Sequence, residues 1–292
     1  MKDFGLMIVD KPVGPTSHHI VGMVRKGTGI RKVGHAGTLD PRASGVLVLC
    51  LGAATRLSEY LSGTSKEYEA LVRFGVSTRT FDTDGEVTHR SNKSPTRREI
   101  DEILPSFRGE IEQRPPPFSA VKVRGRKAYE LARAGDEPDL EPRRVQIHRL
   151  EIHSYTPPDL ALLVECSAGT YIRSLAQDLG ERLGTGAHLA GLRRTRAGPF
   201  RLEESTPMPM LEVGMLTGKW DRYVRPAADA LPDVPAVLVE ADGVEALRFG
   251  HRIPAAPGSP SQAKAVDSEG ELVAILDLID GSMWHPRKVF LS

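Results

Sequence analysis

The 292-residue sequence lacks most of the features that mark secreted or membrane proteins. Its only two cysteines, Cys50 and Cys166, both lie in apolar runs, so neither a disulfide framework nor a Cys-x-x-Cys metal site is expected. No apolar run reaches the roughly 18 residues that a membrane helix needs. The first residues show no cleavable signal pattern. These absences predict a cytoplasmic protein with no membrane partner.

Standard ligand-binding motifs are also missing. The nine histidines never form His-Glu-x-x-His. The glycines match neither the phosphate-binding loop Gly-x-x-x-x-Gly-Lys-Ser/Thr nor the dinucleotide motif Gly-x-Gly-x-x-Gly. We find no internal repeat and no long low-complexity tract. With 40% hydrophobic and 26% charged residues, the sequence predicts a folded globular chain without a standard metal or dinucleotide site.

The net charge of +1 combines two regions of opposite sign. Residues 1–201 contain 31 Lys and Arg against 24 Asp and Glu, whereas residues 202–292 contain 8 against 14. Local fields of this kind attract a phosphate backbone whatever the charge of a distant region. A solvated surface is an equally good interpretation of the charge alone. Two runs concentrate the cations: Arg114, Lys122, Arg124, Arg126, Lys127 and Arg133, and then Arg193, Arg194, Arg196 and Arg201.

Hydrophobic periodicity and capping residues predict a mixed α/β (α+β) chain. Ser17, Ser94 and Thr170 are expected as N-caps of helices, and Gly184 is expected to end the last of these. Four glycines between Lys26 and Asp40 predict an irregular, exposed segment. Strands are expected at residues 6–9, 46–51, 68–74, 120–123, 145–152 and 160–166, and further helices at residues 55–61 and 127–134.

Two regions depart from this core pattern. Three consecutive prolines from Pro115 remove backbone donors, and we interpret residues 114–142 as an excursion from the core. From Pro232 onward the chain is acidic, and glycine, proline and serine separate its strand candidates, as in a small β-rich barrel. Those strands are expected at residues 237–239, 263–266, 272–276 and 288–291.

The densest cluster of unusual residues is the segment that begins Gly34-His35-Ala36-Gly37-Thr38-Leu39-Asp40-Pro41 and ends at Gly45. Its glycines allow close approach to a ligand and hold Asp40 at a fixed exposed position. Taken alone, however, Asp followed by Pro also fits a helix N-cap with a proline at the first helical position.

This segment resembles the signature of the TruB family of pseudouridine synthases, with Asp40 where that family has its nucleophilic aspartate. Further segments resemble the family in the same order along residues 6–200. They are Asp10-Lys11-Pro12 with Gly14 and Ser17, Lys66-Glu67-Tyr68, Pro116-Pro117-Phe118-Ser119, Thr170-Tyr171-Ile172-Arg173, and Leu192-Arg193-Arg194-Thr195.

The resemblance implies isomerisation of a uridine in the tRNA T-loop to pseudouridine, without a cofactor or a metal. Asp40 would be the nucleophile, Tyr68 would stack on the base and handle a proton, and Arg173 would pair with the carboxylate. Attack at C1′, attack at C6 and a glycal route all need the same carboxylate, so the route stays open. Implied substrate contacts are His35, Leu192, Lys11, Gly37 and Thr38, with support of the site left open as the alternative for Lys11.

The resemblance also implies how the chain would hold RNA. The expected RNA-binding residues are Lys122, Arg124, Arg126, Lys127, Arg193 and Arg194. Residues 1–232 would form a pseudouridine synthase domain around a central mixed, largely antiparallel sheet flanked by helices, with residues 114–142 as an RNA-binding thumb. Residues 233–292 would form a PUA-like domain, and the protein would act as a monomer on the T-arm. A non-catalytic tRNA-binding module and a synthase for another RNA are the alternatives.

Overall fold

The computed structural model describes residues 3–136 and 138–291, and the chain folds into two compact units. Residues 1–41, 45–63 and 197–292 form the first unit, and residues 42–44 and 64–196 form the second. Helices are interspersed with strands along the chain, and the strands pair in both parallel and antiparallel directions. The predicted mixed α/β class is therefore confirmed. No helix within the described ranges is long and apolar enough to cross a membrane.

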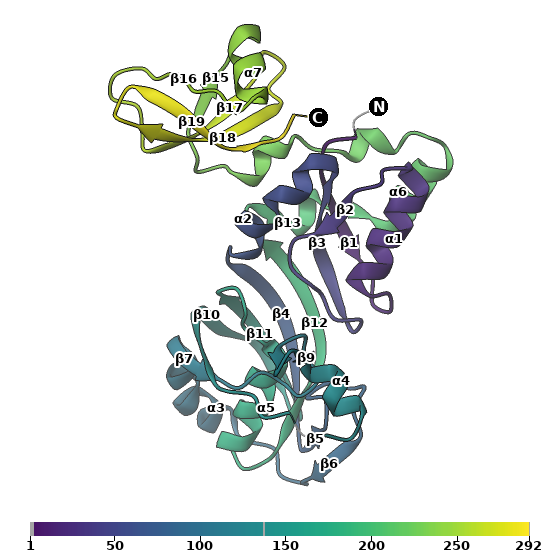
Figure 1. Ribbon diagram of the computed structural model, residues 1–292. Coiled ribbons are helices and arrows are strands. Elements are labelled where there is room, and N and C mark those ends of the chain that lie inside the picture. Colours follow the sequence, from purple (N-terminus) through teal and green to yellow (C-terminus); the bar gives the residue numbers. More distant parts are fainter. Residues whose placement is uncertain (1–2, 137, 292) are drawn as a thin grey trace. The chain divides into compact units, whose positions relative to one another are not determined.

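The first unit is built on the antiparallel pair β1 and β3, whose register runs from Gly5 opposite Leu51 to Lys11 opposite Gly45. Its core side chains, among them Leu6, Ile8 and Val48, are almost inaccessible to solvent. Helices α1 and α6 lie side by side in this unit (Figure 1). The elements are β1 (Gly5–Lys11), α1 (Ser17–Thr28), β2 (Val33–His35), β3 (Ala43–Leu51), η1 (Gly52–Leu57), α2 (Ser58–Ser62), β14 (Thr206–Pro207), which pairs parallel to β1, and α6 (Met208–Leu216).

The C-terminal part of the same unit is a five-stranded sheet in the order β15-β17-β18-β19-β16, which confirms the predicted β-rich tail. Phe290, just beyond the last strand, packs against Phe4 with ring centroids 6.2 Å apart, so this region shares core with the N-terminal strands. From Phe200 onward, the elements other than β14 and α6 are β13 (Phe200–Arg201), η3 (Leu202–Glu204), η4 (Trp220–Tyr223), η5 (Ala227–Ala230), β15 (Ala236–Leu238), α7 (Ala241–Arg248), β16 (Ile253–Pro254), β17 (Gln262–Val266), β18 (Leu272–Ile279) and β19 (Met283–Val289).

The second unit holds the strand order β12-β4-β11-β10-β7, in which β4, β11, β10 and β7 pair antiparallel with one another. Helix α5 packs on β4 (Figure 1). The elements are β4 (Lys66–Phe74), β5 (Val76–Thr78), β6 (Val87–Arg90), α3 (Arg97–Ile103), η2 (Leu104–Phe107), β7 (Gly109–Gln113), β8 (Lys122–Val123), β9 (Arg126–Lys127), α4 (Ala128–Arg133), β10 (Arg143–Thr156), β11 (Asp159–Cys166), α5 (Ile172–Arg182) and β12 (Ala187–Ala197).

The predicted strands and helices are present, but all three predicted N-caps are wrong. Thr16 caps α1 by accepting from the His19 amide, and Thr96 caps α3 in a reciprocal box with Glu99. Tyr171, which has no capping side chain, precedes α5. That helix ends at Arg182, and Gly184 follows its C-cap with φ +64°, as predicted for the glycine that ends the helix. For α1 and α3, a second polar residue one or two positions away fits the same pattern, and only the backbone angles decide which residue is the cap.

The segment between Lys26 and Asp40 is more ordered than predicted. Residues 33–35 form β2, which pairs with β3 from Val33 opposite Leu51 to His35 opposite Leu49. Val33, Ala36 and Leu39 are buried. Glycines suggested irregular structure, but buried apolar residues between them anchor the segment. In the predicted excursion, Glu137 lies outside the described residues.

Candidate active site

The backbone on both sides of Asp40 is fixed by the segment that joins β1 to α1. Ser17 Oγ accepts a hydrogen bond from the Leu39 amide at 2.8 Å and donates one to the Leu39 carbonyl at 2.9 Å. The Gly14 amide donates to the Pro41 carbonyl at 2.8 Å. Asp40 itself is half-buried. Because both neighbours of Asp40 are held, the backbone that carries this carboxylate has a defined position.

Lys11 shapes this holding segment from inside. Its side chain is fully buried, and Nζ donates to the carbonyls of Pro12 at 2.8 Å and Pro15 at 2.9 Å. A buried ammonium needs such acceptors to offset its loss of hydration. This geometry favours support of the site, one of the two roles left open for Lys11, over contact with a phosphate.

The other predicted contacts of the first unit lie on the chain that leads into Asp40. His35 is the last residue of β2, and Gly37 has φ +95°, a conformation that glycine adopts without strain. Thr38 is exposed. The fold thus brings His35, Gly37 and Thr38 to one short segment before Asp40, and their contacts with substrate stay predictions.

In the second unit, Arg173 is buried against a carboxylate that the sequence reasoning missed. Arg173 Nη1 lies 3.7 Å from Asp82 Oδ2, and the two residues are 6% and 7% exposed. The same guanidinium donates to the carbonyls of Thr80 and Phe118, each at 3.1 Å. A cation this deeply buried requires a counter-charge and further acceptors, and Asp82 supplies the charge.

Asp82 is itself fixed by the turn around it. Its Oδ1 accepts from the Asp84 amide at 3.0 Å and from the Thr80 hydroxyl, and its carbonyl accepts from Thr78 Oγ1 at 2.6 Å. The sequence signal was present, since two Asp residues flanked by Thr and Gly are typical of a turn. Nothing in that pattern, however, distinguishes a structural turn from one that orients an arginine.

The start of α5, where Arg173 lies, is tied to the proline-rich segment. The Gln113 side-chain amide accepts from the Tyr171 amide at 2.8 Å and donates to the Tyr171 carbonyl at 3.0 Å. Ser174 Oγ donates to the Arg114 carbonyl at 2.7 Å. These bonds replace a side-chain N-cap and fix the first turn of the helix. Arg173 is therefore held by its helix as well as by its own contacts.

Tyr68 and Leu192 lie on strands of the second unit. Tyr68 is in β4 opposite Val164 and is 9% exposed, and Leu192 is a half-buried residue of β12. The fold therefore places Tyr68, Leu192 and Arg173 in one unit and Asp40 in the other. The pairing of Asp40 with Arg173 stays a prediction.

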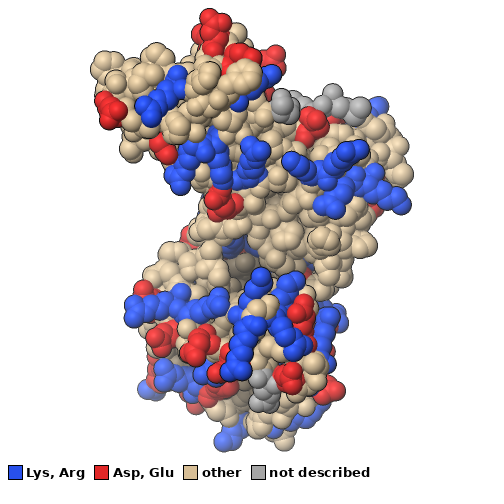
Figure 2. Space-filling model, viewed as in Figure 1, with Lys and Arg blue, Asp and Glu red and all other residues tan. Residues whose placement is uncertain are grey.

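The predicted thumb cations lie on a short hairpin followed by a helix. Lys122, Arg124, Arg126 and Lys127 are all exposed, and Arg124 has φ +50° at the tip of the β8–β9 turn. Lys127 Nζ lies 5.4 Å from the centre of the Tyr129 ring, and Arg133 Cζ lies 5.5 Å from it. Figure 2 shows Lys and Arg side chains gathered where Figure 1 draws β9 and α4.

The second predicted cationic run behaves differently. Arg193 is half-buried, but Arg194 is 1% exposed, so RNA phosphates cannot reach its guanidinium in this structure. The pKa of Lys66 is lowered to about 8, mainly by burial and to a smaller extent by the charge of Arg194. Charge counting does not show which side chains of a strand face the core, so the burial of Arg194 was not predicted from the sequence.

A cationic surface on the first unit escaped the sequence reasoning. Arg25, Lys26, Arg31 and Lys32, which we call the α1 basic surface, are all exposed. No Asp or Glu occurs between Asp10 and Asp40, which is the signal that could have identified it. Figure 2 shows Lys and Arg side chains gathered where Figure 1 draws α1 and α6. Such a surface offers several contacts to a phosphate backbone.

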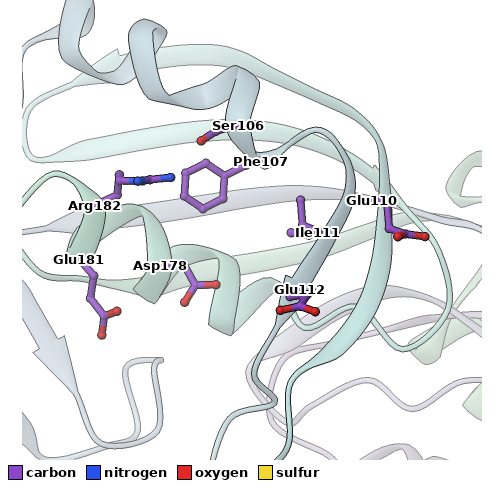
Figure 3. A pocket seen from close by; sticks show the side chains of 8 residues that line it. All are labelled: Ser106, Phe107, Glu110, Ile111, Glu112, Asp178, Glu181 and Arg182. Atoms are coloured by element: carbon purple, nitrogen blue, oxygen red, sulfur yellow. The ribbon is translucent and has the colours of Figure 1, made fainter.

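A cavity of about 600 Å³ lies between η2, β7 and α5, and none of its lining residues is a predicted site residue (Figure 3). Asp178 lies in the wall of this cavity, and its pKa is raised to about 6, mainly by burial and to a smaller extent by the charge of Glu181. Within residues 3–136 and 138–291, no cluster of three or more His, Cys, Asp or Glu side chains is placed to hold a metal ion. The lining residues are Ser106, Phe107, Glu110, Ile111, Glu112, Asp178, Glu181 and Arg182.

Comparison with known sequences finds two matching family profiles. Residues 25–172 match the N-terminal domain of the TruB family pseudouridylate synthases, and residues 173–231 match the tRNA pseudouridylate synthase B C-terminal domain. A tRNA pseudouridine synthase B from Solibacter usitatus is 41% identical over 98% of this chain and 99% of its own length. One from Symbiobacterium thermophilum is 47% identical over 85% of this chain and 82% of its own.

Comparison with solved structures finds similar folds in RNA-protein complexes. A chain of a Cbf5-Nop10-Gar1 complex has a TM-score of 0.75 and 30% identity, and the match covers 99% of this chain and 85% of that one. A chain of an H/ACA RNP bound to a substrate RNA containing 2'-deoxyuridine has a TM-score of 0.75 and 27% identity, with coverage of 99% and 86%. The similarity thus extends over nearly all of this chain.

Proposed function

Because this chain belongs to the TruB family of pseudouridylate synthases and isomerises uridine to pseudouridine in tRNA, we propose that it acts on the T-loop uridine at position 55 and uses Asp40 as nucleophile. The observation that carries the nucleophile assignment is the anchoring of Leu39 by Ser17 and of Pro41 by Gly14. That anchoring fixes the backbone that carries one ionisable group, the carboxylate of Asp40, on a loop.

The isomerisation breaks the bond between uracil N1 and ribose C1′ and forms one between uracil C5 and C1′. The proton that C5 loses is balanced by the one that N1 gains, so no redox partner and no cofactor are needed. Asp40 provides the carboxylate that the reaction requires, and Tyr68 stacks on the base and passes the proton. Arg173, fixed by Asp82, provides a permanent positive charge to pair with the nucleophile.

The target base has to leave the folded T-loop before it can react, which costs a few kcal/mol of stacking and pairing. Contacts to the RNA backbone offset that cost. We assign these contacts to the thumb cations Lys122, Arg124, Arg126 and Lys127 and to the α1 basic surface. His35, Leu192, Gly37 and Thr38 would contact the uridine or its neighbours, and Arg193 the backbone.

The remaining parts of the chain have supporting roles. We assign residues 1–232 to the catalytic domain and residues 233–292 to a PUA-like accessory domain, whose acidic charge disfavours a primary role in phosphate binding. The enzyme would act as a monomer on the T-arm, in the cytoplasm where tRNA is found. A variant without residues 233–292 should bind tRNA only modestly more weakly, provided that it folds.

The position of modification tests the proposal directly. Purified enzyme is incubated with an unmodified tRNA transcript, and pseudouridine is mapped by carbodiimide labelling and primer extension. We expect one stop, at the T-loop uridine, and no product when that uridine is replaced by cytidine. Product at another uridine, or at none, would contradict the proposed substrate.

A further inference from the structure

A second ion pair connects the residues that follow Asp40 to the turn that holds Arg173. Arg42 lies two positions after Asp40, and its Nε donates to Asp84 Oδ1. The Asp84 amide in turn donates to Asp82 Oδ1 at 3.0 Å, and Asp82 pairs with Arg173. Arg42 and Asp84 thus extend the Arg173–Asp82 contacts to the backbone just after Asp40.

The turn that carries Asp84 is rigid enough to serve as an anchor. Thr78 Oγ1 and Thr80 Oγ1 both donate to Asp82, and the Arg79 amide donates to the Glu86 carbonyl at 2.9 Å. Gly85 leaves no room for a side chain, since a Cβ there would lie 2.5 Å from the Thr80 amide nitrogen. Asp84 therefore lies in a turn whose backbone is held by its own hydrogen bonds.

We propose that Arg42 is a positioning residue for the reaction: its ion pair with Asp84 fixes the backbone after Asp40 to the turn that orients Arg173. The inference rests on the proposed roles of Asp40 and Arg173. The guanidinium is engaged by a carboxylate, which favours this role over contact with an RNA phosphate, because a phosphate would have to displace Asp84. The Arg42 and Asp84 side chains are 55% and 44% exposed, so the pair contributes little to overall stability.

The test separates chemistry from binding. Arg42→Gln, Asp84→Asn, the double variant and the charge swap Arg42→Asp with Asp84→Arg are compared by single-turnover tritium release and by tRNA affinity. We expect each single change to lower the single-turnover rate about fivefold, which corresponds to an exposed pair, while affinity stays unchanged. The double variant should be no slower than either single variant, and the swap should recover most of the rate.

Arg79→Gln is the matched control, because Arg79 is an exposed arginine of the same turn and its loss leaves the pair intact. Weaker binding without a slower rate in Arg42→Gln, together with normal behaviour of Asp84→Asn, would assign Arg42 to an RNA phosphate and overturn the proposal. Additive losses in the double variant, or full rates in both single variants, would also overturn it. Failure of the proposed function is distinguishable, since wild type itself would then release no tritium from T-loop uridine.

Discussion

Arg173 and Asp82 form a buried ion pair, with Nη1 and Oδ2 3.7 Å apart, that the sequence pattern did not identify. The pair explains how a permanently charged side chain is tolerated at 6% exposure near the start of α5. It also means that Arg173 is oriented by its own unit before any substrate arrives. The pairing proposed for Asp40 would therefore use a guanidinium that Asp82 already orients.

Replacing Asp82 with Asn should damage both stability and chemistry. Removal of one partner from a buried ion pair is strongly destabilising, so we expect the free energy of unfolding to fall by about 3 kcal/mol. The single-turnover rate should fall about 100-fold because the guanidinium loses its orientation. Urea unfolding and tritium release measure the two effects. The control Asp159→Asn breaks the more exposed pair with Arg73 and should cost less than about 1 kcal/mol; equal losses in both variants would contradict the account.

Ser17→Ala should lower the rate of chemistry without changing tRNA affinity. It removes both hydrogen bonds to Leu39 and frees the backbone beside Asp40. Thr16→Ala is a matched control, because it removes the α1 cap at a cost of about 1 kcal/mol and leaves the Leu39 bonds in place. Single-turnover kinetics and filter binding separate rate from affinity. If the two variants were equally slow, anchoring of Leu39 would not be the cause.

Neutralising the α1 basic surface should weaken tRNA binding and its salt dependence. In the triple variant Lys26→Gln, Arg31→Gln and Lys32→Gln, each lost phosphate contact lowers the slope of log affinity against log salt by about one. Affinity measured at several salt concentrations gives that slope. Arg98→Gln removes an exposed cation that pairs with Glu102 on α3 and serves as the control. A slope unchanged from wild type would exclude this surface from the RNA interface.

Asp178 should make the stability depend on pH in the acidic range. Its pKa is raised from 3.8 to about 6, so between these values the folded state binds a proton that the unfolded state has released. The free energy of unfolding of the wild type therefore falls as pH rises through this window. Asp178→Asn has no titrating group at this position, so its free energy of unfolding should not fall in this window. Relative to wild type, its free energy of unfolding should rise by at most about 3 kcal/mol between pH 4 and pH 6. Urea unfolding at pH 4, 5, 6 and 7 measures it.

The control for that series is Glu110→Gln, which removes an exposed carboxylate from the wall of the same cavity (Figure 3). An Asp178→Asn advantage that is the same at pH 4 and pH 7 would show that loss of a titrating group is not its source.

Much of the fold could be predicted from the sequence because strands such as residues 46–51 and 160–166 are continuous or alternating apolar runs. The starts of the helices could not be predicted, since Thr16 and Ser17 are both suitable N-caps. In the structure Thr16 caps α1, and Ser17 holds Leu39. The charge of Arg194 was visible, but its burial on β12 depends on tertiary packing.

Only some residues of the candidate site could be recognised from the sequence. The motif residues Asp40, Tyr68 and Arg173 were recognisable because each lies in a short segment similar to a known family. Asp82, Asp84 and Arg42 were not, because their importance lies in contacts between residues about 40 to 90 positions apart. A single sequence contains no record of such distant pairs.

The central claim is that Asp40 is the nucleophile for pseudouridine formation at the T-loop uridine. Tritium release from tRNA that carries 5-tritiated uridine, compared between wild type and Asp40→Asn, tests it most directly. We expect release of one equivalent per tRNA by the wild type and none by Asp40→Asn, with tRNA affinity retained in both. Release by Asp40→Asn at the wild-type rate would contradict the claim.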